Sequence, residues 1–133
     1  SGAAFTRFER VVEAQGGDPR ALSDRTLLPG YSGRLDIAAP RDGYVASFAC
    51  AEIGRAGVMI GAGRATKEAR IDPGVGIDVH VRLGDEVAAG DPIFTVLYND
   101  TTHVASAAAR LRASFAVGDA PVTPPPLVLT RLD

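Results

Sequence analysis

The chain has 133 residues, of which 46% are hydrophobic and 23% are charged, so it can form a globular domain around one core, and wholesale disorder is excluded. Its net charge of −2, with interspersed acidic and basic residues, excludes the basic surface that binds a nucleic-acid backbone. The sequence has no stretch of 18 apolar residues and no signal-like N-terminus, so we expect no membrane partner. The only cysteine, Cys50, cannot form an internal disulfide, which is typical of a cytoplasmic protein.

The first predicted element is a helix over residues 3–15. Phe5, Phe8 and Val12 recur at helical spacing, while charged residues take the other face. Gly16 supplies the left-handed stop that ends many helices.

This helix presents an apolar face at the start of the chain and has no capping residue of its own. We therefore expect residues 1–17 to belong to, or lead from, a domain that lies upstream. Residues 18–133 are expected to form the C-terminal domain.

Two strands are predicted over residues 33–39 and 43–48, after an irregular connection over residues 18–32. Hydrophobic and charged residues alternate in the first strand, and Tyr and Val favour extended backbone in the second. The reverse-turn sequence Pro40–Gly43 separates them, so we expect the two strands to pair with each other.

A glycine-containing helix is predicted over residues 50–61. Gly54 and Gly57 each cost about 1 kcal/mol relative to alanine, which predicts that the helix backbone approaches a sheet closely at these positions. The sequence Gly61-Ala62-Gly63 ends the helix.

A polar loop over residues 64–73 leads into two further strands. Residues 76–83 alternate strictly and residues 93–98 form the second strand. Between them lie two turns, from which Val87 is expected to point inward.

A third helix is predicted from a cap at Thr101 or Thr102 to a stop at Gly118. Its apolar stripe comprises Val104, Ala107, Ala108, Leu111 and Phe115. After a proline-rich spacer, residues 127–130 can add a short strand. The element order, strand–strand–helix–strand–strand–helix after an N-terminal helix, predicts an α+β fold.

The isolated chemical groups do not form a recognisable active site. His80 and His103 have no histidine or cysteine at ligand spacing, so a surface position is favoured over a metal or acid–base role. Cys50 lies near a helix N-terminus, where thiols are activated, but a small residue packed at a helix start is the simpler interpretation. We predict no catalytic residue, no metal and no cofactor in this chain.

Other motifs also favour structural interpretations. Gly61-x-Gly63 lacks the strand, helix and third glycine of a dinucleotide loop, and no serine lies in a Gly-x-Ser-x-Gly elbow. Turn formation explains the aspartates more simply than paired-carboxylate catalysis does; these are Asp72, Asp78, Asp85 and Asp91.

Lys67 is the only lysine. The runs over residues 39–45 and 83–96 look like the half-barrel repeats of biotinyl and lipoyl carrier domains, which bear their cofactor on a lysine at a hairpin tip. Here Lys67 lies in a long loop, which disfavours that interpretation. A carrier domain and a stand-alone binding module are the alternatives.

Five collinear motifs extend over nearly the whole chain. They are Phe8-x-x-Val11-Val12-x-Ala14-Gln15-Gly16-Gly17-Asp18, Ala39-Pro40-Arg41-Asp42-Gly43-Tyr44-Val45, Ile53-Gly54-Arg55-Ala56 leading to Gly61-Ala62-Gly63-Arg64, Ile71-Asp72-Pro73-Gly74-Val75-Gly76-Ile77, and Gly84-Asp85-x-Val87-x-x-Gly90-Asp91-Pro92. Together they resemble the C-terminal domain of the pyrimidine-nucleoside phosphorylases, the thymidine phosphorylase family. AMP phosphorylases are similar in this region.

The resemblance implies an α/β-hammerhead domain related to barrel-sandwich hybrids. It also implies a parent enzyme, a homodimer, that cleaves a pyrimidine nucleoside with phosphate to give the free base and (2-deoxy)ribose 1-phosphate. The family's substrate-binding residues belong to segments upstream of this chain, so the chain alone is expected to be inactive and to act as structural support.

One segment, residues 63–70, is a candidate for contact with the anionic substrates of such a parent. It contains Arg64, Lys67 and Arg70, and glycines border it. We expect this loop to fold over the cleft between domains when substrate binds.

Overall fold

The computed structural model describes residues 2–128 and 130–131, and the chain divides into two compact units, residues 1–30 and 31–133. The predicted N-terminal helix is confirmed as α1 (Ala3–Ala14). Two short 3-10 helices follow it, η1 (Pro19–Leu22) and η2 (Arg25–Leu27), where an irregular connection was predicted. Within the described residues, no helix has the length and apolar character that a membrane crossing requires.

Aspartate caps explain the two 3-10 helices. Asp18 accepts a hydrogen bond from the backbone N–H of Arg20, and Asp24 accepts one from that of Thr26, each at 3.0 Å. These bonds satisfy donors that a helix start otherwise leaves free. The apolar face of α1 stays open, since Phe5 and Phe8 are 46% and 53% exposed.

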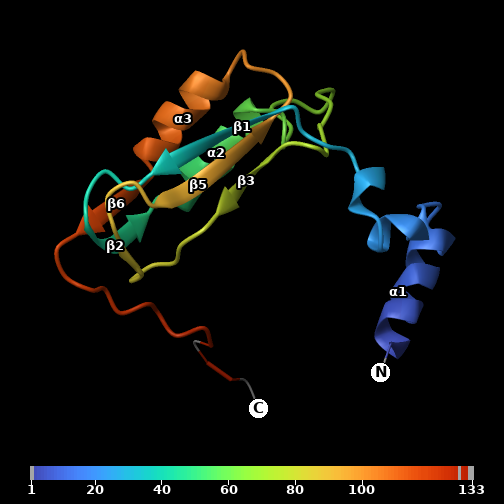
Figure 1. Cartoon of the computed structure of the whole chain (residues 1–133), viewed down its shortest axis with the longest axis horizontal. Coiled ribbons are helices and arrows are strands. Elements are labelled where there is room, and N and C mark those ends of the chain that lie inside the picture. Colours follow the sequence, from blue (N-terminus) through green and yellow to red (C-terminus); the bar gives the residue numbers. More distant parts are fainter. Residues whose placement is uncertain (1, 129, 132–133) are drawn as a thin grey trace. The chain divides into compact units, whose positions relative to one another are not determined.

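The second unit contains two three-stranded antiparallel sheets, confirming the α+β fold (Figure 1). In the first sheet, β5 (Pro92–Tyr98) lies between β1 (Gly33–Ala38) and β3 (Gly76–Val79). In the second, β2 (Gly43–Phe48) lies between β4 (Glu86–Val87) and β6 (Phe115–Gly118).

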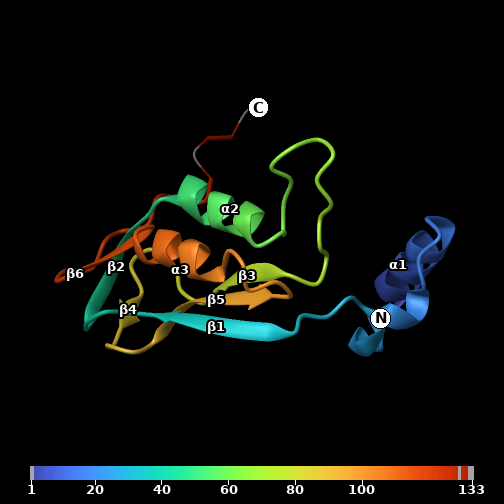
Figure 2. The ribbon, with the colours of Figure 1, turned by 90° about the horizontal axis from the view of Figure 1, so that it is seen from above.

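Two helices pack against each other in this unit, α2 (Cys50–Met59) and α3 (Val104–Arg112). Figure 2 shows both on the same side of the β1–β5–β3 sheet. Glu52 of α2 forms ion pairs with Arg55 in its own helix and with Arg110 of α3, so a single carboxylate joins the two helices.

The predicted pairing of the first two strands is wrong. Both strands form as expected, but β1 pairs with β5 and β2 pairs with β4 and β6. The turn at Pro40–Gly43 therefore carries the chain from one sheet to the other. Gly43 has φ +146°, which L side chains rarely adopt, and a Cβ there would lie 2.4 Å from the carbonyl oxygen of Gly118.

The core is centred on β5, whose residues Ile93, Phe94, Thr95 and Val96 are all buried. The ring of Phe94 packs edge-on against Phe48 and Phe115, with centroids 6.0 and 5.7 Å apart. Consecutive residues are buried in a middle strand that is covered on both faces. Its sequence therefore lacks the alternation of apolar and polar residues that a half-buried strand shows. Val87 is 4% exposed, so its predicted inward position is confirmed.

Two predicted elements are longer than the observed ones. The strand over residues 76–83 ends at Val79, which is 51% exposed rather than buried. β3 lies at the edge of its sheet and pairs with β5 alone. The third helix ends at Arg112, and the residues predicted as its last turn form β6. Phe115 faces Phe94 from that strand.

The predicted threonine cap of the third helix is also wrong. His103 is the N-cap residue and its side chain makes no capping bond. Instead Asp100 accepts bonds from the backbone N–H and the hydroxyl of Thr102 one turn earlier. The predicted strand over residues 127–130 includes residue 129, which lies outside the described residues; residues 127, 128 and 130 are not in a strand.

The predicted close approach at the helical glycines does not occur at Gly54. Among the described residues, a Cβ at Gly54 would meet nothing within 4 Å, and one at Gly57 would meet Ile77 Cδ1 at 3.9 Å, an ordinary contact. The predicted stop is confirmed, because α2 ends before Gly61, which has φ +93°.

Candidate functional site

The candidate loop leaves the end of α2 and returns at β3 (Figure 2). Its two ends are joined at Asp72, whose backbone N–H donates to the carbonyl of Gly61 at 2.9 Å. The Asp72 carboxylate accepts a bond from the Gly74 N–H at 2.9 Å and another from Asn99 Nδ2 at 2.8 Å. Asp72 thus ties the helix end, the loop end and the segment after β5 together, and we call it the Asp72 clasp.

A pocket of about 210 Å³ lies at this clasp. Its lining combines an apolar floor with polar groups, namely Met59, Ile60, Gly61, Asp72, Asp100 and His103. Hydrogen bonds hold both carboxyls in their charged forms: the Asn99 amide lowers the pKa of Asp72, and the Thr102 hydroxyl lowers the pKa of Asp100. His103 was predicted as a surface residue, and it is exposed while also lining this pocket.

The three predicted loop cations lie outside the clasp. Arg64, Lys67 and Arg70 are exposed, and none of them lines the pocket. Lys67 is not at the tip of a tight two-strand hairpin, which is the position that a carrier lysine requires; it lies between α2 and β3. The three cations are therefore exposed to solvent on a loop whose two ends are joined by the hydrogen bonds of Asp72.

The predicted packed position of Cys50 is wrong. Cys50 is the first residue of α2, as the sequence indicated, but it is exposed. Its side chain borders an apolar groove with Phe48 and Ile53.

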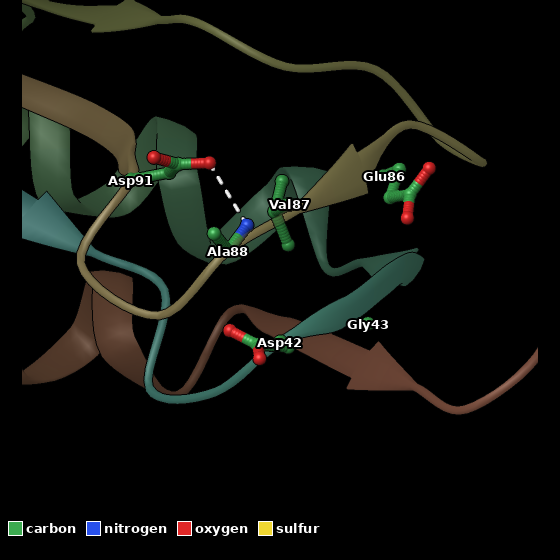
Figure 3. A pocket seen from close by; sticks show the side chains of 6 residues that line it. All are labelled: Asp42, Gly43, Glu86, Val87, Ala88 and Asp91. Carbon is green, nitrogen blue, oxygen red and sulfur yellow. Dashed lines mark hydrogen bonds between the residues drawn. The ribbon is translucent and has the colours of Figure 1, made fainter.

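The aspartates of the turns have structural partners, as predicted. Asp91 accepts a bond from the N–H of Ala88 at 2.8 Å (Figure 3), and Asp85 accepts one from the N–H of Arg82 at 2.7 Å. The pocket in Figure 3 is also lined by Asp42 and by Glu86, and Glu86 lies at the opposite end from Asp91. Asp42 accepts from the N–H of Ala89 at 2.7 Å, and the described residues contain no group of three side chains that could hold a metal ion.

Sequence reasoning missed a polar chain across the first sheet. The Thr95 hydroxyl donates to Asp36 at 2.6 Å, and His80 Nε2 lies 2.7 Å from the same hydroxyl oxygen. Because the only hydroxyl proton goes to Asp36, His80 donates to Thr95. Arg34 adds an ion pair to Asp36 at 3.0 Å. The alternation placed Arg34, Asp36 and His80 on polar faces. That they meet at Thr95 is revealed only by the pairing of β5 with β1 on one side and with β3 on the other.

The hydrogen bonds to Asp36 predict that acid lowers the stability of the folded state. The Thr95 hydrogen bond, followed by that of Arg34, lowers the pKa of Asp36 below its ordinary 3.8. A lowered carboxyl pKa stabilises the folded state above the unfolded-state pKa, and that contribution is lost as the pH falls through the folded-state value. Urea midpoints measured from about pH 5 to about pH 2 should therefore fall less in Asp36→Asn than in the unaltered chain.

The control is Asp78→Asn. Asp78 of β3 lies opposite Thr95, but its carboxylate makes no hydrogen bond or ion pair with another described residue. An acid response in Asp36→Asn equal to that of the unaltered chain would contradict the prediction.

Comparison with known proteins assigns the chain to a family. Residues 44–118 match the pyrimidine nucleoside phosphorylase C-terminal domain. The pyrimidine-nucleoside phosphorylase of Geobacillus stearothermophilus is 32% identical over 131 residues, which cover 98% of this chain and 30% of that protein. The corresponding protein of Staphylococcus aureus (strain USA300) is 34% identical over 124 residues, which cover 93% of this chain and 28% of that protein. The chain spans less than a third of the length of these curated relatives, and it belongs to the pyrimidine nucleoside phosphorylase C-terminal domain family.

Proposed function

We propose that this chain is the C-terminal domain of an enzyme that cleaves pyrimidine nucleosides with phosphate, giving the free base and (2-deoxy)ribose 1-phosphate. One observation carries the proposal: the relatives named pyrimidine-nucleoside phosphorylase align with 98% and 93% of this chain, but with only 30% and 28% of their own length. The rest of the parent chain is its principal partner, and phosphate and nucleoside bind through that part.

In this proposal the reacting groups lie upstream and the domain is structural support. Residues 1–17 lead from the upstream domain, and residues 18–133 form a hammerhead-type domain. The parent is a cytoplasmic homodimer. The structural role is supported by the aspartates, whose carboxylates make hydrogen bonds in turns and in the polar chain.

The direct test is an activity assay of the 133-residue chain with phosphate and either thymidine or uridine, beside a full-length pyrimidine-nucleoside phosphorylase. We expect the chain alone to release no free base above the blank. Release of base by the chain alone would show that it carries a complete active site. The full-length parent, assayed with AMP as well, would distinguish a pyrimidine-nucleoside phosphorylase from an AMP phosphorylase.

The loop over residues 63–70 has the properties of a cleft-closing segment in that parent. It is anchored at its base by the Asp72 clasp, and its three cations are exposed. Cations that reach an anionic substrate only on closure lower the KM for phosphate and exclude water.

Replacing Arg64 and Lys67 together by alanine in the full-length parent should therefore raise the KM for phosphate, by about tenfold if each cation supplies roughly one exposed ion pair's worth of binding. The matched control replaces Arg25 and Arg112, which are also exposed, so that the same charge is removed elsewhere. Unaltered kcat and KM in the loop variant would refute the closing role without affecting the assignment of the domain.

A further inference from the structure

An apolar groove of about 450 Å³ lies between the start of α2 and the segment after β3. Its lining comprises Phe48, Cys50, Ile53, Val79, Val81, Arg82 and Leu83. Val79 is 51% exposed, so the groove presents apolar surface to solvent. Such surface is a common site of association.

The C-terminal tail, residues 119–128, passes directly beside this groove. Its carbonyl at Val122 lies 2.5 Å from the position of a Cβ on Gly84, and Pro124 lies 3.6 Å from the same position. Gly84 follows Leu83, the last residue of the groove wall. Figure 1 shows the red tail passing the turn at which the segment after β3 leads into β4.

The tail carries two exposed apolar side chains. Leu127 is 101% exposed and Val128 is 71% exposed. Three prolines, residues 124–126, precede them and favour an extended conformation with a rise of about 3.1 Å per residue. Leu127 is therefore about 9 Å along the tail from Pro124, and Val81 is about 10 Å along an extended chain from Gly84.

We propose that the C-terminal tail is a strap whose Leu127 and Val128 seat in this groove. The tail already lies against Gly84 at Val122 and Pro124, so seating requires only a movement of the residues that follow Pro124. The length of the proline segment is similar to the extended length of chain from Gly84 to Val81 of the groove wall. The two exposed aliphatic side chains and the apolar wall would leave water together.

The experiment uses Cys50, the only cysteine of the chain, which borders the groove. Its rate of reaction with a thiol reagent is measured in the 133-residue chain and in Leu127→Asp/Val128→Asp. We expect the double variant to react at least about fivefold faster, because a seated strap must open before the reagent enters. The control, Ala120→Asp/Thr123→Asp, adds the same charge to exposed tail positions and should react like the unaltered chain.

A second variant tests the groove wall. Val79→Asp places a charge at an exposed position, so the fold should persist, as far-ultraviolet circular dichroism can verify, and Cys50 should react as fast as in the tail variant. Equal rates in the unaltered chain and in both variants would overturn the proposal. Protection that increases with protein concentration would also overturn it, since the groove would then be covered by a second copy.

Discussion

Phe94→Ala is expected to lower the free energy of unfolding of residues 31–133 by about 3–5 kcal/mol. Phe94 is fully buried on the middle strand β5, and its ring contacts Phe48 and Phe115 from two strands of the other sheet. Its removal would leave a cavity between the two sheets and would also remove two edge-on ring pairs, each contributing about 0.5–1.5 kcal/mol. Urea denaturation monitored by circular dichroism measures the change.

Phe8→Ala is the matched control, because it deletes the same side chain where the ring is 53% exposed. We expect a change within about 1 kcal/mol there. A small effect of Phe94→Ala, comparable with that of Phe8→Ala, would mean that the two sheets do not share a core.

Gly43→Ala is expected to cost about 3 kcal/mol or more. Gly43 has φ +146°, and an added Cβ would lie 2.4 Å from the Gly118 carbonyl oxygen and 2.8 Å from Val117 Cγ1. The first of these atoms is backbone in the paired strand β6, so it cannot rotate away as a side chain could. Relief requires β2 and β6 to separate where the chain enters the second sheet.

Gly90→Ala separates the two causes of that loss. Gly90 also has a positive φ, +95°, but among the described residues a Cβ there would meet nothing within 4 Å. It should cost only the backbone strain of about 1–2 kcal/mol. If the two variants lose equal stability in the same urea titration, the close approach of β2 and β6 is not what requires glycine at position 43.

The elements could be predicted from local pattern, but their partners could not. Apolar periodicity located α1, β1, β2, α2 and β5 within a few residues. Every alternating strand satisfies the same rule, however, so the sequence did not indicate that β1 pairs with a strand 60 residues later. Phe115 fitted the stripe of the third helix, and its contact with Phe94 across the core was not apparent from spacing.

The lack of information on which strands pair also limited the prediction of the functional site. The loop with Arg64, Lys67 and Arg70 was evident from its composition, and the structure adds its anchor at Asp72. The Asp36–Thr95–His80 chain escaped notice because its members come from β1, from β5 and from the residue after β3, and the partners of these strands were unknown. Family resemblance supplied the identity that these local patterns could not.

The placement of β5 also constrains when the protein can fold during synthesis. The first sheet has β5 as its centre, so β1 has no partner strand until residue 98 has left the ribosome. β2 likewise pairs only with residues 86–87 until residue 118 follows. Pairings this distant along a chain form slowly. The nascent polypeptide therefore carries an unpaired β1 until β5 is complete and an unpaired edge of β2 until β6 is complete, and a chaperone that binds extended apolar segments would meet β1 and β2 first.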